Sequence, residues 1–434
     1  MKTNIYKYIL VAFISISFSN SKLYAQGCVA VRQMGGINPL SLNGYTLPKG
    51  EFQIGTGYRY FHSFRHFVGT DEKAFRQTTQ GGFDANGNEK GNAVNIYSHA
   101  VDLNISYALT NRIQFNLTMP FVHNERSQVL KTKTGSKIEI DGKMVDQVLE
   151  GTRYSVYAKG LGDIRVSGSY WIFDPAKASK GNLLVGLGIK TNSGSHSATD
   201  DAIVLDPKTK QVITETQVMD QAIQPGDGGV GFSIEIQGFR QLYKGVYGFV
   251  NGYYLFNPRE SNGTYKSDPT VVKDKNNKTL GTLTGYNVYA SPDQYFVRAG
   301  AMTSVLKSKK LTLSLAGRFE GIPAYDAFGG QEAYRRPGYV IGIESGVSYI
   351  AGKHSFGLFI PYNVAKNRVQ SAADIASQNL QNSVITNESE KVHVQGDAAF
   401  ADYSINFIYS YRLGKLFNKS ANTIGKISLP GANK

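Results

Sequence analysis

Residues 400–413 (FADYSINFIYSYRL) alternate between apolar and polar side chains along their length. One face carries Tyr403, Ile405, Phe407, Tyr409 and Tyr411, and the other is polar except for Ile408. A period of two residues indicates a β-strand with one apolar and one polar face. Strands of globular proteins usually have about 5–6 residues, whereas a tilted strand that crosses a bilayer needs about 9–11. The segment therefore predicts a membrane-spanning strand.

Eleven earlier segments show the same alternation. They are 51–62, 96–109, 112–121, 162–173, 182–192, 229–241, 246–256, 294–306, 311–320, 337–350 and 354–363. The weakest is 246–256 (VYGFVNGYYLF), because its two faces are equally apolar. Backbone groups inside a bilayer must all be paired, so strands that cross it have to close into a barrel.

The connections between these segments alternate in length. Long ones span 63–95, 122–161, 193–228, 257–293, 321–336 and 364–399, and short ones span 110–111, 174–181, 242–245, 307–310 and 351–353. Outer-membrane barrels have an even strand number, short periplasmic turns and long extracellular loops. Soluble all-β domains show no such alternation and have shorter strands. We therefore predict an all-β fold, a closed antiparallel transmembrane β-barrel of about twelve strands in which 400–413 pairs with 51–62.

The two ends of the chain suggest how it reaches its membrane. Residues 1–25 carry Lys2 and Lys7, an apolar stretch over 9–18 and a small residue at Ala25, the pattern of a signal peptide. We predict a lead-in over 26–50, in the periplasm or the lumen, the barrel over 51–413, and a basic periplasmic tail over 414–434. Cys28 is the only cysteine, so an internal disulfide is excluded. The residues before Cys28 favour cleavage after Ala25 over lipidation.

Charge is distributed unevenly. The net charge of +14 falls to about +11 when Lys2, Lys7 and Lys22 are removed with the signal peptide. Basic residues lie singly at the short turns and in the tail, where they meet lipid phosphates. Proteins that bind nucleic acid usually carry a continuous basic stripe. We expect outer-membrane lipids and a small solute as partners, and no nucleic acid.

The polar faces of the strands supply the candidate site residues. Twelve charged side chains are expected to line the lumen: Arg59, Asp102, Asp163, Arg165, Lys190, Glu235, Arg298, Arg318, Glu320, Glu344, Asp402 and Arg412. Six are basic and six acidic. They are expected to form an ion-pair lattice that fills or stiffens the interior, or a charge-balanced passage or binding site for a small solute, and the two are compatible. Eight strands give a filled barrel and 16–18 an open channel. With twelve, an inward-folded loop or the lead-in would constrict the lumen.

Enzymatic and metal chemistry is not indicated. His62 and His66 share a strand face but lie about 13 Å apart, so we expect both at a solvated rim and bound to no metal. Residues 193–197 (SGSHS) lack the G-x-S-x-G elbow of a nucleophile. Asp200, Asp201 and Asp227 do not match an EF-hand and are interpreted as loop residues. We expect no catalytic residues and no cofactor.

Several short motifs resemble a known family. They are LPKG at 47–50, GLGDI at 160–164, MPF at 119–121, RRPGY at 335–339 and GDAAFADY at 396–403. They are similar to outer-membrane proteins named for the meta-pathway of phenol degradation and their transporter branch. The resemblance covers nearly all of 35–413. It implies a β-barrel that moves small, including aromatic, molecules across the outer membrane.

The sequence thus predicts an outer-membrane channel or transporter for passive passage of small, aromatic or hydrophobic solutes. Two alternatives from other classes remain open at this point. One is a lipid-modifying hydrolase embedded in the outer membrane, which would need a serine and a histidine paired at the rim. The other is a structural or adhesive barrel that acts through its long loops.

Overall fold

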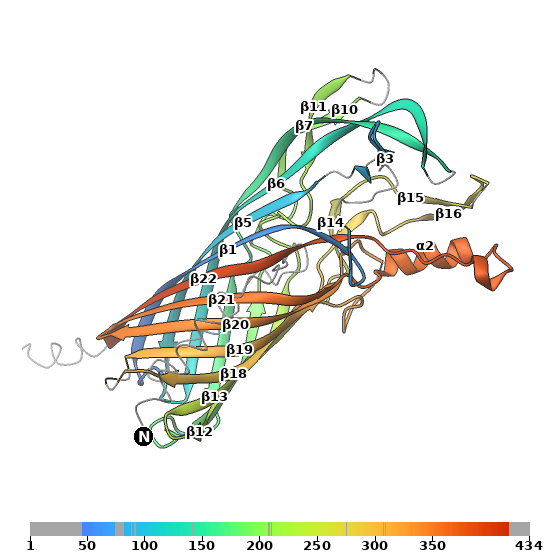
Figure 1. Cartoon of the computed structure of the whole chain (residues 1–434). Coiled ribbons are helices and arrows are strands. Elements are labelled where there is room, and N and C mark those ends of the chain that lie inside the picture. Colours follow the sequence, from blue (N-terminus) through green and yellow to red (C-terminus); the bar gives the residue numbers. More distant parts are fainter. Residues whose placement is uncertain are drawn as a thin grey trace, which may run out of the picture.

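A computed structural model describes residues 46–73, 82–87, 89–90, 93–140, 143–206, 209, 211–274, 276–306, 308, 310–330 and 332–415. Twelve antiparallel strands close into a barrel (Figure 1). They are β1 (Glu51–Val68), β5 (Asn95–Ala108), β6 (Ile113–Ile140), β8 (Arg165–Trp171), β9 (Gly181–Lys190), β12 (Gly231–Tyr243), β13 (Val246–Phe256), β18 (Gln294–Ser304), β19 (Leu311–Ile322), β20 (Gly338–Ala351), β21 (His354–Asn367) and β22 (Ala398–Lys415). The predicted fold class is confirmed.

Closure depends on the last strand. β22 pairs antiparallel with β1 from Glu51↔Lys415 to Phe67↔Ala398 and, on its other edge, with β21. β1 also pairs with β5, so no barrel strand has a free edge along this seam. The predicted pairing of 400–413 with 51–62 is confirmed. Both described chain ends lie at the end of the barrel that carries the short turns, which is the periplasmic end in outer-membrane barrels.

Side chains alternate between the lumen and the outer surface. On β12, Phe232, Ile234 and Ile236 are 38–48% exposed, whereas Ser233 and Glu235 between them are buried. Because apolar side chains on a soluble surface are rarely so contiguous, this outer belt is the lipid-facing surface of a transmembrane barrel. The ambiguous segment β13 is also resolved, since Asn251, Tyr253 and Leu255 point inward and are buried.

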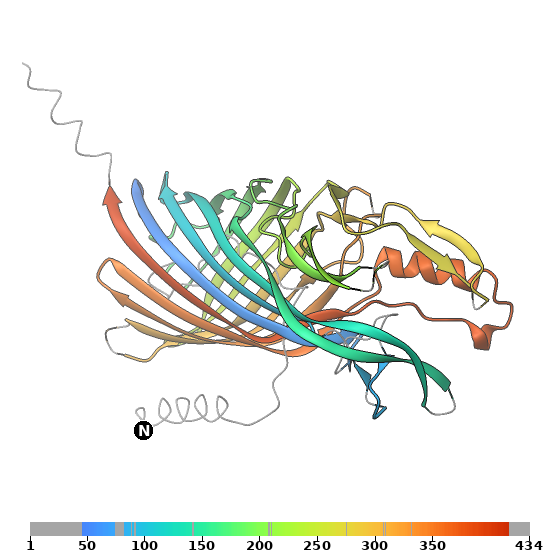
Figure 2. The same ribbon diagram turned by 90° about the horizontal axis from the view of Figure 1, so that it is seen from above.

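The connection predicted over 122–161 is mostly strand. β6 is 28 residues long in total and continues past Phe121 to Ile140. It forms a long hairpin with β7 (Lys143–Leu161), paired from Phe121↔Leu161 to Ile140↔Lys143. The hairpin extends well past the barrel (Figures 1 and 2). Beyond the membrane both faces of a strand can be polar, so the hydrophobic alternation that reveals a strand disappears there. The sequence predicts hairpins above the membrane only within parts of 131–150 and 262–280.

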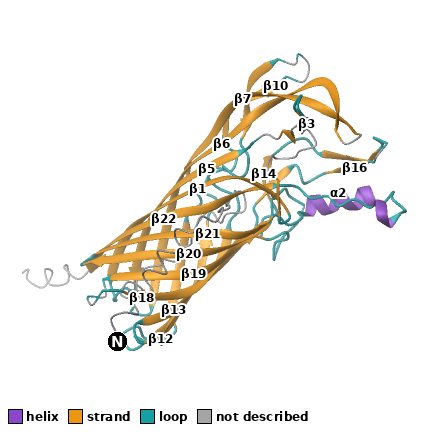
Figure 3. Ribbon diagram, viewed as in Figure 1, coloured by secondary structure: helices purple, strands orange, loops and turns teal. Residues whose placement is uncertain are grey.

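The other extracellular elements are short (Figure 3). They are β2 (Asp71–Lys73), β3 (Gly82–Phe83), β4 (Glu89–Lys90), β10 (Thr199–Leu205), β11 (Val212–Val218), β14 (Ser261–Tyr265), β15 (Thr270–Lys273), β16 (Thr279–Leu283), β17 (Val288–Ala290), α2 (Ala372–Asn382) and the 3₁₀ turn Glu388–Glu390. A capping box formed by Ser371 and Asp374 starts α2. Neither helix of the described chain is long and apolar enough to cross a membrane.

Several predictions concern residues outside the described part of the chain. They are the signal peptide over 1–25, Cys28, most of the lead-in and the tail beyond residue 415. The described end of the lead-in contacts the barrel, because Arg412 donates a hydrogen bond of 3.3 Å from Nη2 to the carbonyl of Thr46. Leu47 next to it is buried.

Candidate functional site: the closed extracellular end of the lumen

The barrel wall is interrupted between β7 and β8. Leu161 is the last residue of β7 to pair with β6, and pairing resumes at Arg165, which faces Thr118. Pro120 lies opposite the interruption and has no N–H to donate, but its carbonyl accepts a hydrogen bond of 2.7 Å from Gly162. The hydroxyl of Ser193 accepts from the N–H of Ile164 and donates to the carbonyl of Gly162. Side chains thus replace the missing ladder.

Asp163 lies in this interruption and points into the barrel. Its side chain is buried and accepts backbone hydrogen bonds of 3.0 Å from both Gly194 and Asp227. One carboxylate oxygen also lies 3.2 Å from Nζ of Lys190, the last residue of β9. Burying an ionised carboxylate is costly unless it is paired and hydrogen-bonded, and both conditions are met here.

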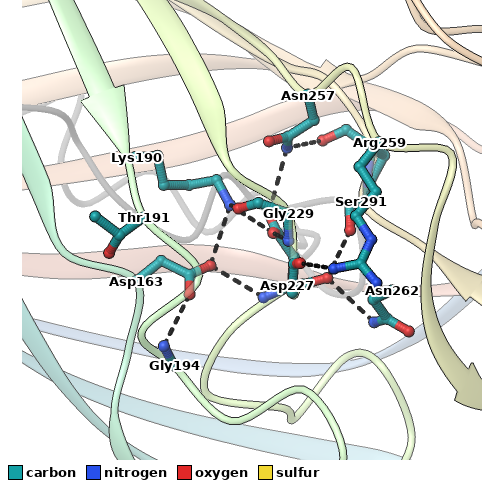
Figure 4. A network of polar contacts seen from close by, with 12 residues as sticks. Asp163, Lys190, Thr191, Gly194, Asp227, Gly229, Asn257, Arg259, Asn262 and Ser291 are labelled. Carbon is teal, nitrogen blue, oxygen red and sulfur yellow. Dashed lines mark hydrogen bonds and ion pairs between the residues drawn. The ribbon is translucent and has the colours of Figure 1, made fainter.

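Lys190 binds a second carboxylate. Its Nζ lies 2.5 Å from Oδ1 of Asp227 and 2.5 Å from the carbonyl of Gly229 (Figure 4). Asp227 is also enclosed on its far side, because its carbonyl accepts from Asn262 and from Ser291 at 3.1 and 2.8 Å. Asp227 lies in a loop, as interpreted from sequence, but its burial and its pairing with Lys190 were not foreseen. The signal that would have revealed it is the flanking glycines of PGDGG, which allow the backbone to approach closely.

Residues 219–229, here called the plug segment, fold against the inner wall of the barrel, where they contact β6 at Asn124 and β9 at Lys190. Met219 and all of 223–229 are buried although they form no strand or helix. Gly194 and Gly226 cross at the interruption. A Cβ on Gly194 would lie 2.8 Å from Cα of Gly226, and a Cβ on Gly226 would lie 2.6 Å from Oδ1 of Asp163. Only glycine fits at this crossing, so its chain path depends on those two residues.

The barrel wall also holds the plug segment at its start. The amide of Asn124 on β6 donates to the carbonyl of Ile223 at 2.9 Å, and Ser98 orients Asn124. The apolar side chains of Met219 and Ile223 pack with Val94, Ile96 and Val156. The expectation that an inward-folded loop constricts the lumen agrees with this arrangement.

A second set of carboxylates orders the neighbouring loops. Asp326 accepts from Arg335 at 2.6 Å and from the backbone N–H of Asp293 at 2.8 Å. Asp293 accepts in turn from Asn257 and from Ala327. Burial raises the pKa of the Asp326 carboxyl, although Arg335 opposes the shift. These loops therefore form one hydrogen-bonded layer with the plug segment.

Deeper in the barrel, four of the predicted residues form an ion-pair cluster. Glu344 binds both Arg298 and Arg318, the latter at 2.9 Å, and Arg318 also binds Glu320 at 2.8 Å. All four side chains are buried. The guanidinium groups of Arg298 and Arg318 also lie over the rings of Phe359 and Phe296, respectively. The arrangement corresponds to the ion-pair lattice that the sequence offered as one reading.

The remaining predicted residues are spread around the lumen. Arg165 is buried with its guanidinium 4.8 Å from the ring centre of Tyr253, and Glu235 accepts from Ser233 at 3.0 Å. Asp402 lies 3.7 Å from Arg65 and 3.8 Å from Lys366. Arg59, Asp102 and Arg412 are half-buried. The predicted set is thus brought together in two clusters and several single positions, not in one site.

The periplasmic half of the lumen contains a cavity of about 70 Å³ with a mixed polar and apolar wall. Its wall includes Gly55, Gly57, Asn104, Asn116 and Asn406, with Arg59 and Asp102 also lining it. The glycines of β1 bring no side chain into the space. Small and amide side chains therefore leave room for water or a small solute at this level.

One histidine differs from its expected position. His66 was expected at a solvated rim, but it is buried with Nδ1 2.8 Å from Asp397 and Nε2 3.3 Å from the carbonyl of Val94. The cause is the return of the 368–397 connection over the end of β1, which loop sequence alone does not reveal. Among the described residues, no group of His, Cys, Asp and Glu is arranged to hold a metal ion.

Comparisons with known proteins give remote structural likeness only. No protein-family model matches the chain, and no curated protein matches it. An outer membrane channel from Pseudomonas putida F1 aligns with a TM-score of 0.48, 10% identity, and 87% of this chain and 99% of that chain covered. The Ralstonia pickettii toluene transporter TbuX gives 0.38, 11%, 90% and 99%, and the monoaromatic hydrocarbon channel CymD gives 0.39, 10%, 90% and 98%.

At such scores the likeness carries no residue role over to this chain, and the resemblance to the phenol meta-pathway family stays a prediction. The chain's own geometry decides its location. A closed antiparallel barrel with an apolar outer belt, short turns at one end and long loops at the other is the architecture of outer-membrane proteins. The protein is a β-barrel of the outer membrane.

Proposed function

We propose that this barrel is a passive channel for small solutes whose extracellular end is closed by the plug segment. The observation that carries the proposal is the nature of the closure. It is built from a loop that a few side chains hold, chiefly Lys190 between Asp163 and Asp227. Loops are the elements that open locally at low cost, so the barrel wall can stay intact while the passage opens.

The interior supports passage of small molecules. Below the closure the lumen changes from the ion-pair cluster to the cavity near Asn104 and Asn406. Arg298, Arg318, Glu320 and Glu344 balance one another in charge, so a neutral or singly charged solute meets no strong field of one sign. We propose small, including aromatic or hydrophobic, molecules as the class that passes.

The test is a comparison of the intact barrel with a variant in which 220–228 is replaced by a glycine-serine linker. Both are reconstituted in planar bilayers for conductance and in liposomes for swelling with sugars, amino acids and aromatic acids. We expect rare, small conductance steps for the intact chain and larger, frequent ones for the variant. If neither protein conducts and neither admits any solute, the channel function is refuted. Lipid hydrolysis by the intact chain would instead point to an enzyme.

A further inference from the structure

The cavity of about 70 Å³ in the periplasmic half of the lumen is bounded by two glycines of β1, Gly55 and Gly57. A Cβ on Gly57 would lie 3.8 Å from Cβ of Asp102 and 3.9 Å from the carbonyl oxygen of Phe407, which are ordinary contact distances. The φ angle of Gly57 is not positive either. Neither a collision nor the backbone conformation therefore requires glycine at position 57. Glycine inside a strand often marks a place where a ligand approaches closely, and here it keeps a space open.

The wall of this cavity carries no net charge. Among the described residues, its charged side chains are Arg59 and Asp102, one of each sign. The remaining polar side chains of the wall are amides and hydroxyls, those of Gln53, Asn104, Ser106, Asn116, Thr118, Asn406 and Ser410. Without an excess of one sign, the cavity does not concentrate ions. A few convergent neutral groups of this kind suit an uncharged solute that bears several hydroxyl groups.

Two of these side chains have hydrogen-bonding groups to spare. Oδ1 of Asn116 accepts hydrogen bonds of 2.8 Å from both Ser106 and Gln114, which leaves the NH₂ group of Asn116 for another partner. Gln53 is only 9% exposed, and its side chain makes no hydrogen bond within the described part of the chain. Buried polar groups are nearly always hydrogen-bonded, so we expect a solute or water to complete both side chains.

The size of the cavity disfavours an aromatic ring. One water molecule needs about 10–15 Å³, and an engineered apolar cavity that binds benzene has about 150 Å³. The cavity of about 70 Å³ therefore holds roughly five water molecules, which is the space that a short polyol fills.

We propose that this cavity is a binding site for small neutral polyols of three or four carbon atoms, such as glycerol and erythritol. The solute hydroxyls bind the amides of Gln53 and Asn116, and the hydrogen at Gly57 leaves room for the carbon chain. This inference rests on the proposed channel function for its role in passage, because the solute reaches the cavity through the lumen. It names the solute class that one level of that passage selects.

The experiment measures binding of erythritol to the full-length barrel by saturation-transfer difference NMR, in a deuterated detergent without a sugar head group. Three neutral competitors are compared. Glycerol is a shorter polyol, 1,4-butanediol has the chain of erythritol with fewer hydroxyls, and benzyl alcohol carries a ring. We expect glycerol to displace erythritol, and the other two to require at least tenfold higher concentrations. Equal displacement by all three would overturn the proposal.

The matched variants are Gly57→Val and Gly317→Val. The first fills the cavity, and the second adds the same volume at an exposed position of β19, where the nearest neighbour of a Cβ would be the carbonyl oxygen of Ala299 at 3.9 Å. Both must keep the heat-modifiable electrophoretic mobility of a folded barrel. We expect Gly57→Val to weaken erythritol binding at least tenfold and Gly317→Val to leave it unchanged. Unchanged binding in Gly57→Val would contradict the assignment.

A second variant keeps the proposal testable if Gly57→Val does not fold. Gln53→Leu retains the approximate size of the side chain and removes its amide. Loss of one neutral hydrogen bond should weaken erythritol binding about fivefold, while 1,4-butanediol should be affected less. Erythritol binding equal to that of the parent chain would remove Gln53 from the site and refute the proposed recognition.

The binding site and the channel function fail separately. Erythritol binding in detergent, combined with no conductance and no solute uptake, supports the site and refutes the channel. Conductance and solute uptake without erythritol binding keep the channel and overturn the site. Both are read from the same preparation, so differences in folding cannot produce the contrast.

Discussion

Nζ of Lys190 lies 2.5 Å from Oδ1 of Asp227, so the last residue of a barrel strand is joined directly to a loop 37 residues further along the chain. The same ammonium group lies 3.2 Å from Asp163. One cation thus lies between two buried carboxylates, and three separate segments meet at it. The stability of the extracellular closure is concentrated at this point.

Removing this cation should release the plug segment. Lys190→Met leaves both carboxylates buried without their counter-ion, and breaking a buried ion pair on one side typically costs about 3–5 kcal/mol. We expect more frequent channel openings in planar bilayers and faster hydrogen exchange in 219–229. Lys244→Met, at an exposed periplasmic turn, is the control. Unchanged exchange in the Lys190→Met variant would show that the ion pairs do not hold the loop.

The crossing of Gly194 and Gly226 should be equally sensitive to added side-chain volume. Gly194→Ala places a Cβ 2.8 Å from Cα of Gly226 and 2.9 Å from the carbonyl carbon of Gly162. Backbone atoms cannot yield as a side chain does, so the plug segment must move outward. We expect increased liposome swelling with small sugars. Gly317→Ala, whose nearest neighbour would be 3.9 Å away, should behave like the parent chain, and equal swelling of both variants would contradict the role of the crossing.

The Asp220 carboxyl should make the stability of the start of the plug segment depend on pH. Burial would raise the pKa of this carboxyl, but the charges of Arg336 and Arg126 outweigh it and hold the pKa well below the ordinary 3.8. Because the pKa of Asp220 is lower in the folded than in the unfolded state, the ionised carboxylate stabilises the folded state at pH values above the unfolded-state pKa. This stabilisation is lost as the pH falls from the unfolded-state pKa through the folded-state pKa. Hydrogen exchange of 219–223, corrected for intrinsic rates, should be constant between pH 5 and 8 and increase only below about 4.

Asp220→Asn is the control for this pH dependence. The variant removes the carboxylate and leaves Arg336 without the partner that binds it through two nitrogens. Exchange in 219–223 should then be fast at pH 7 and show no further acid step. An acid step that persists in the variant would assign the titration to another group.

The ion-pair cluster in the lumen should control ion selectivity. Glu344→Gln removes the carboxylate that both Arg298 and Arg318 bind. Because Glu320 still pairs with Arg318, the cluster is left with one net positive charge. We expect the reversal potential in a potassium chloride gradient to shift toward chloride, together with a loss of stability of about 3–5 kcal/mol. Glu332→Gln, on an exposed loop, should change neither. A reversal potential like the parent's would place the cluster outside the conducting path.

The barrel strands were predictable because lipid and lumen impose opposite polarity on alternate residues. That constraint assigned Glu235 to the polar face from sequence alone, and in the structure Glu235 is buried next to the exposed Ile234. This alternation of polarity ends where the membrane ends, and for that reason the continuation of β6 to Ile140 was not recognised from sequence. The strand β13 lacked the contrast because Tyr253 and Leu255 are aromatic or apolar residues that face the lumen.

The closure could be predicted only in part. Asp163 and Lys190 lie in segments predicted as strands, and both side chains are buried, although Asp163 itself falls in the interruption between β7 and β8. Asp227, His66 and Asp220 acquire their partners through loops that fold back from positions distant in sequence, and no local pattern encodes such a contact. Their nearest local signals are the glycines around Asp227 and the arginine pair Arg335 and Arg336, whose partners only tertiary structure identifies.

Shortening the β6–β7 hairpin would test whether the long loops carry a separate adhesive role. Replacing 131–150 with a two-residue turn removes the distal pairs, while pairs such as Asn124↔Ala158 and Arg126↔Val156 remain. We expect unchanged conductance and a folded barrel, because the lumen and the plug segment make their contacts nearer to the membrane. If the truncated chain lost solute passage while its barrel stayed folded, the hairpin would have to be part of the entry path.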